Sequence, residues 1–96
     1  MSEKELYRQK MQAQLDEWKA DVDKLKAKSA GASADAKLKI EQEHKALDAR
    51  IAEGKTKLAA LGDATEGEWH SLKEGIESAW ATMKSAIAEA VAKFKA

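Results

Sequence analysis

The sequence predicts an all-α protein in which long amphipathic helices form an antiparallel helical hairpin or coiled-coil bundle. Three observations predict this class. The 96 residues include no proline and five glycines, so few positions oppose a helix. Charged residues make up 35% of the chain, and a composition rich in Ala, Lys, Glu and Leu is typical of long helices. Apolar residues return at steps of three and four along most of the chain.

The composition argues against several functional classes. Seventeen basic residues balance seventeen acidic ones, so no overall field attracts nucleic acid or an anionic membrane. Cysteine is absent, which leaves no disulfide and no thiolate metal site. The first residues form no apolar signal segment, and no apolar run reaches the roughly 18–20 residues that a membrane span needs. We therefore expect one cytoplasmic domain.

Residues 1–61 are predicted to form one long helical arm. Ser2 and Glu5 have the spacing of a capping box at its start. Polar residues of mixed sign lie between the apolar ones, as on a solvated helix face. The apolar stripe of the arm comprises Tyr7, Met11, Leu15, Trp18, Val22, Leu25, Ile40, Leu47, Ile51, Leu58 and Leu61.

A break in this arm would fall in the segment 29–33, which reads Ser-Ala-Gly-Ala-Ser. Gly31 suits the end of one helix, and Ser33 suits the cap of the next. The stripe nevertheless keeps its phase across the segment, and one glycine inside a helix costs only about 1 kcal/mol relative to alanine. We therefore expect a continuous helix, and a turn that makes a three-helix bundle is the alternative.

A turn is predicted at 62–67, followed by a C-terminal amphipathic helix at 68–96. Gly62 suits a helix end, and Thr65 with Glu68 has the spacing of a capping box. The apolar steps of the last helix repeat every eleven residues, which is almost three turns and keeps one stripe about 100° wide. That stripe comprises Trp69, Leu72, Ile76, Trp80, Met83, Ile87, Val91 and Phe94.

Both stripes together form what we term the association seam. An exposed row with two tryptophans marks an interaction surface, so the last helix must pack on the first arm, on another copy, or on both. Folding the shorter helix back on a continuous first arm would leave about half of that arm uncovered, and this half includes Tyr7, Met11, Leu15 and Trp18. A second copy is the simplest cover, and twofold symmetry is the commonest arrangement. We therefore expect a homo-oligomer, with a dimer favoured.

No constellation of catalytic, cofactor-binding or metal-ligating residues is apparent. The two histidines are His44 and His70, and carboxylates are the only potential metal ligands one turn away from either; His44 with Asp48 is such a pair. That pair is weak evidence for zinc. The motif Glu-x-x-His occurs once, at Glu41, whereas a di-iron bundle needs two copies and two further glutamates. We expect no enzyme, no small-molecule substrate and no cofactor.

A lipid surface is the alternative to the helical seam. Eleven-residue amphipathic repeats with tryptophan, phenylalanine and lysine are used by helices that lie in a bilayer interface. Lys73 and Lys84 are placed to face anionic headgroups, but Glu74 and Glu77 lie on the same polar face. The seam between helices is therefore the favoured prediction.

The stretch 7–28, YRQKMQAQLDEWKADVDKLKAK, and the repeated units that begin at Trp69 and Trp80 resemble a family of small bacterial coiled-coil proteins linked to stress responses. The chain departs from that family's alanine-rich, charged helix at Gly31. The resemblance implies a bacterial cytoplasmic protein with no established biochemical activity, and it implies no catalytic residues. The expected function is a non-enzymatic structural or scaffolding role through self-association.

Overall fold

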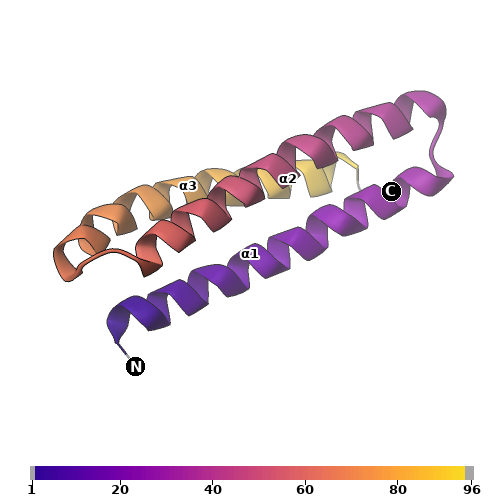
Figure 1. The fold of residues 1–96 in the computed structure, drawn as a ribbon. Helices are drawn as coiled ribbons and strands as arrows, with labels where there is room; N and C mark the ends of the chain where they lie inside the picture. Colours follow the sequence, from indigo (N-terminus) through magenta and orange to yellow (C-terminus); the bar gives the residue numbers. More distant parts are fainter. Residues whose placement is uncertain (1, 95–96) are drawn as a thin grey trace.

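The computed structural model describes residues 2–94, and in this range the chain forms a bundle of three long helices (Figure 1). The helices are α1 (Glu3–Ala27), α2 (Ala34–Gly62) and α3 (Glu66–Lys93), with a 3₁₀ turn (Lys28–Gly31) between the first two. Successive helices run antiparallel, so α1 and α3 point the same way. The bundle measures 51 × 20 × 18 Å. The all-α bundle class is confirmed.

The prediction of one continuous helix over 1–61 is wrong, and the three-helix alternative describes the fold. The backbone leaves the helix at Ala32 and Ser33, both extended, with ψ of 159° and 164°. The Ser33 hydroxyl accepts a hydrogen bond from the Ala36 amide at 3.3 Å, which caps α2. Gly31 has no positive φ, so the corner does not use glycine's left-handed conformations. The turn is stabilised because it lets α2 cover the apolar stripe of α1 within the same chain.

The apolar stripe keeps its helical phase across the turn at 28–33 because of how that turn packs against the core. Ser29 is buried at 9% exposure, and Ala32 packs against the core. A corner between two packed helices needs small side chains on its inner side, because the backbones there come close together. The phase therefore reflects a core that continues under the turn.

The second turn confirms the predicted capping box. The Thr65 hydroxyl accepts a hydrogen bond from the Glu68 amide at 3.4 Å, and the Glu68 carboxylate accepts one from the Thr65 amide at 3.1 Å. At the start of α1 only half of the predicted box forms: Ser2 accepts from the Glu5 amide at 3.2 Å. The Glu5 carboxylate instead pairs with Arg8 at 3.2 Å. Helix α3 ends at Lys93, and residues 95–96 of the predicted last helix lie outside the described residues.

Two lysines near the ends of α1 donate hydrogen bonds to carbonyls at the C-terminal ends of α2 and α3. Lys4 Nζ donates to the carbonyls of Gly62 and Ala64 at 3.3 and 3.0 Å, where α2 ends. Lys28 Nζ donates to the Phe94 carbonyl at 3.5 Å, where α3 ends. Because the last carbonyls of a helix lack intrahelical partners and carry partial negative charge, these ammonium groups stabilise both C-termini.

The core runs the length of the bundle between the three helices. Trp80 of α3 reaches across it, and its indole Nε1 donates to the Met11 carbonyl of α1 at 3.4 Å. Gly54 of α2 leaves the space that this ring fills: a Cβ at Gly54 would lie 3.2 Å from Trp80 Cη2. The core therefore depends on one contact among all three helices near its middle.

Candidate interaction grooves

The structure places most of the association seam in the core of a single chain. Fourteen of its residues are buried and three are partly buried, whereas Leu72 and Val91 remain 38% and 42% exposed. The partly buried members are Tyr7, Trp18 and Phe94. The buried members are Met11, Leu15, Val22, Leu25, Ile40, Leu47, Ile51, Leu58, Leu61, Trp69, Ile76, Trp80, Met83 and Ile87.

The expectation that the region from Tyr7 to Trp18 needs a second copy for cover is wrong. Leu15 is fully buried, and Tyr7 and Trp18 lie beside the two tryptophans of α3, with ring centroids 6.0 and 6.2 Å apart. That expectation requires a continuous helical arm over residues 1–61 facing a helix half as long. Because the chain turns at 28–33, three helices of similar length cover one another. Self-association stays a prediction, and it needs a different surface.

Leu72 and Val91 identify two such surfaces. Both belong to the apolar stripe of α3, but they lie on opposite flanks of it. Leu72 lines a groove between α2 and α3, and Val91 lines a groove between α1 and α3. The stripe of α3 is therefore wider than the two neighbouring helices cover.

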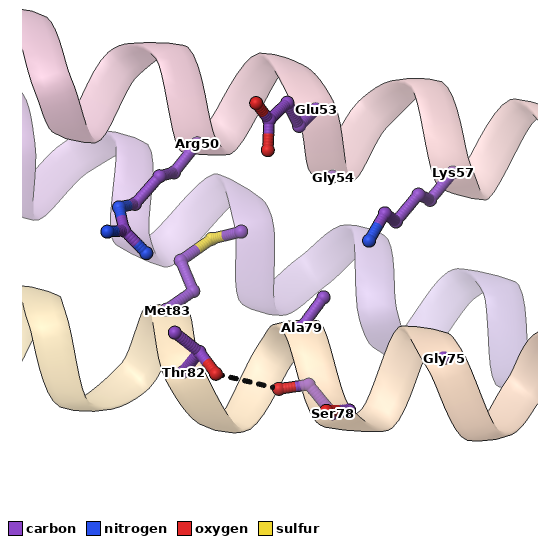
Figure 2. Close-up of a pocket in the computed structure, with 9 residues that line it drawn as sticks. All are labelled: Arg50, Glu53, Gly54, Lys57, Gly75, Ser78, Ala79, Thr82 and Met83. Atoms are coloured by element: carbon purple, nitrogen blue, oxygen red, sulfur yellow. Dashed lines mark hydrogen bonds between the residues drawn. The ribbon is translucent and has the colours of Figure 1, made fainter.

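The groove between α2 and α3 has two adjoining hollows of about 300 and about 200 Å³. Both hollows share Lys57 and Gly75 as lining residues. The side chains of Arg50 and Lys57 extend from α2 towards α3 across the first hollow (Figure 2). Among residues 2–94, neither cation makes an ion pair with a protein carboxylate. This groove therefore presents two cations, with the Glu53 carboxylate between them on α2, above a floor that includes Met83.

The α3 wall of this groove is built from small side chains. Ser71, Gly75, Ser78 and Thr82 lie at steps of four, three and four along its exposed side. A Cβ added at Gly75 would meet nothing within 4 Å. Because helix backbones approach each other to about 8 Å only where the facing side chains are small, this wall is suited to contact with another helix.

The groove between α1 and α3 is more apolar and lies nearer the end of α3. It has hollows of about 410 and about 120 Å³, which share Asp21 and Val91. The larger hollow is bounded by Trp18, Lys84 and Ile87, and the smaller by Leu25 with two more lysines, Lys24 and Lys28.

The groups with shifted pKa values lie in contacts that stabilise the fold. The Lys19 ammonium hydrogen-bonds the Asp48 carboxylate at 2.7 Å between α1 and α2, which lowers the pKa of Asp48 and raises that of Lys19. The capping bonds with Thr65 lower the pKa of Glu68. Burial, with Glu77 nearby, raises the pKa of Tyr7 to about 12. None of these carboxylates has the raised pKa that a general acid needs.

The histidines and acids assemble no metal centre within the described residues. His44 lies between α1 and α2, with its Nε2 3.6 Å from Asp23, and no group of three or more potential ligands forms among residues 2–94. His70 stacks on Trp69 at 4.3 Å. In the same part of the chain, no helix combines the length and hydropathy of a membrane-spanning segment.

The two grooves are features that sequence reasoning missed. The apolar stripe indicated which face of α3 turns inward. How much of that stripe α1 and α2 cover depends on how the three helices pack. The heptad-like steps of small residues from Ser71 to Thr82 are the signal that points to the second exposed face.

Comparisons with protein-family models, with curated proteins and with solved structures give no match to this chain.

Proposed function

We propose that this chain is a non-enzymatic helical association protein that forms a homodimer through the groove between α2 and α3. The observation that carries the proposal is the exposure of Leu72, a member of the α3 stripe, beside a wall of small side chains. Exposed apolar surface next to a flat, small-residue helix face favours docking of a second helix.

Twofold pairing suits this surface because the same groove would supply both partners. In an isologous contact, the α3 wall of one copy lies against the groove of the other. The bundle is 51 Å long, so two copies aligned along it have the length to bury the roughly 1,200–2,000 Å² of a stable interface.

The wider role within this proposal is structural. The resemblance of segment 7–28 and of the Trp69 and Trp80 units to bacterial stress-linked coiled-coil proteins supports a scaffolding role in the cytoplasm under stress. The shifted pKa values of Lys19, Asp48 and Glu68 arise from an interhelical bridge and a helix cap, which is consistent with a protein that performs no acid–base chemistry.

Light scattering across a concentration series tests the proposal. We expect a species of twice the 10.5 kDa chain mass at high concentration. Ser78→Arg places a long cation on the proposed contact and should give the single-chain mass with unchanged helicity. Ala20→Arg, on the exposed outer face of α1, is the matched control and should remain dimeric. A single-chain mass for the wild type at every concentration would refute the dimer.

A further inference from the structure

We propose that the groove between α1 and α3 binds one long-chain carboxylate of the fatty-acid type. The acyl chain lies on the apolar floor formed by Val91 and Ile87, and the carboxylate faces Lys84. This inference goes beyond the proposed function, because it uses the opposite flank of α3 and does not require a second copy.

The dimensions favour a slender ligand. Two solvent-open hollows of about 410 and about 120 Å³ adjoin at Asp21 and Val91, so together they extend along the groove between α1 and α3. An α-helix is about 10–12 Å across with its side chains, so even three turns of one need much more room. An extended hydrocarbon chain is slender enough to lie along these hollows between two parallel helices.

The floor is apolar and already partly uncovered. Val91 is 42% exposed although it belongs to the inward stripe of α3, and Trp18 is partly buried against the core. Covering these side chains with an acyl chain would remove apolar surface from water, at about 25 cal/mol per Å². The smaller hollow beside Leu25 extends the same floor towards the end of α3.

The charges select an anion. Three lysines and one aspartate, Asp21, border the two hollows. The Lys28 ammonium donates to the Phe94 carbonyl, whereas among residues 2–94 the Lys84 side chain forms no ion pair and no hydrogen bond. A carboxylate at Lys84 would gain a charge-assisted hydrogen bond.

The helix ends set the direction of the ligand. Helices α1 and α3 are parallel, so both place C-terminal carbonyls, with partial negative charge, near the Lys28 end of the groove. The partial negative charge at the Lys28 end of the groove disfavours a carboxylate, so the methyl end of the acyl chain lies there. The Lys24 and Lys28 side chains then cover the hydrocarbon with their methylene groups.

Calorimetry with dodecanoate below its micelle concentration tests the site. We expect saturable binding of one dodecanoate per chain. Lys84→Glu should weaken it by about tenfold, as expected for loss of a hydrogen bond to a charged group. Lys26→Glu makes the same charge change at an exposed position of α1 that borders neither hollow, and it should bind as the wild type does. Equal binding by these two variants would overturn the proposal.

Two further measurements separate a built site from general affinity for amphiphiles. Dodecyltrimethylammonium, with the same chain and a cationic head, should bind at least about tenfold more weakly. Val91→Asp should abolish dodecanoate binding while circular dichroism stays unchanged, because Val91 is not needed to close the core. Equal binding of both amphiphiles, or full binding by Val91→Asp, would count against the site.

A membrane surface is the competing explanation, and it gives a different result. Binding to anionic phospholipid vesicles without binding of dodecanoate would reject the proposed site. The Ser78→Arg variant should bind dodecanoate as tightly as the wild type, so a failed dimer and a failed ligand site are distinguishable.

Discussion

Gly54 of α2 and Trp80 of α3 are complementary: the missing side chain of the glycine is the space that the indole occupies. A Cβ on Gly54 would lie 3.2 Å from Trp80 Cη2, 3.1 Å from Leu15 Cδ2 and 3.3 Å from Met83 Cε. Side chains from α1 and α3 thus converge on one glycine of α2. This contact explains why a residue that weakens helices occupies the middle of α2.

Alanine substitution at two glycines tests this arrangement. Gly75→Ala adds a methyl group to open space, so it should raise the free energy of unfolding by up to about 1 kcal/mol. Gly54→Ala gains the same helix propensity but forces three core side chains to move. We expect it to be about 1–3 kcal/mol less stable than Gly75→Ala in urea denaturation. Equal stability of the two variants would mean that the core yields without cost.

Replacing Trp80 should abolish the cooperative fold. Trp80 is 4% exposed, and truncating a buried tryptophan costs about 3–5 kcal/mol, close to the total stability of a small domain. Trp80→Glu adds a buried charge to that loss. We expect no cooperative thermal transition by circular dichroism. Leu72→Glu, at an exposed position of the same helix, should melt cooperatively, and a wild-type melt for Trp80→Glu would contradict the core assignment.

The bridge between Lys19 and Asp48 should contribute stability that depends on pH. The hydrogen bond from Lys19 lowers the pKa of Asp48 below its ordinary value of 3.8. A lowered carboxyl pKa stabilises the fold above that value, and the contribution is lost as the pH falls through the folded-state pKa. Both side chains are about 40% exposed, so solvent screening limits the effect to under about 1 kcal/mol.

Comparison of Asp48→Asn with the wild type measures this contribution. In urea denaturation the variant should be less stable at pH 7 and equally stable near pH 2. A raised Lys19 pKa gives the corresponding loss at high pH, where the contribution disappears as the pH rises through the folded-state value. A constant difference across the acid range would exclude this linkage.

Tyr7 offers a spectroscopic test of how α1 meets α3. Burial and the nearby Glu77 raise its pKa from 10.0 to about 12, and its hydroxyl lies 3.5 Å from the Lys73 carbonyl, to which it donates. The chain has one tyrosine and its three tryptophans do not ionise, so the change in ultraviolet absorbance with pH reports Tyr7 alone. We expect ionisation near pH 12.

The stability that depends on neutral Tyr7 should be present below pH 10 and be lost as the pH rises towards 12. Glu77→Gln removes the charge and should lower the pKa part of the way, since burial remains. A pKa near 10 in the native protein would show that Tyr7 faces water.

Local chemistry along the chain was sufficient to specify the helices and most of the core. The chain has no proline to interrupt a helix. The Thr65–Glu68 cap and the spacing of the apolar stripe involve residues within a few turns of one another, so the sequence predicts them without knowledge of the tertiary structure. Fourteen of the predicted seam residues are buried for this reason. The same periodicity could not show whether the seam closes within one chain.

Packing between distant segments decided the rest. At 28–33 a continuous helix and a turn differ locally by only a few hydrogen bonds, and the turn wins because α2 then covers α1. The exposure of Leu72 and Val91 follows from how far α1 and α2 reach around α3. The inward position of Gly54 follows from Trp80, which lies 26 residues further along the chain. Helix formation is local, whereas burial depends on residues that meet only after folding.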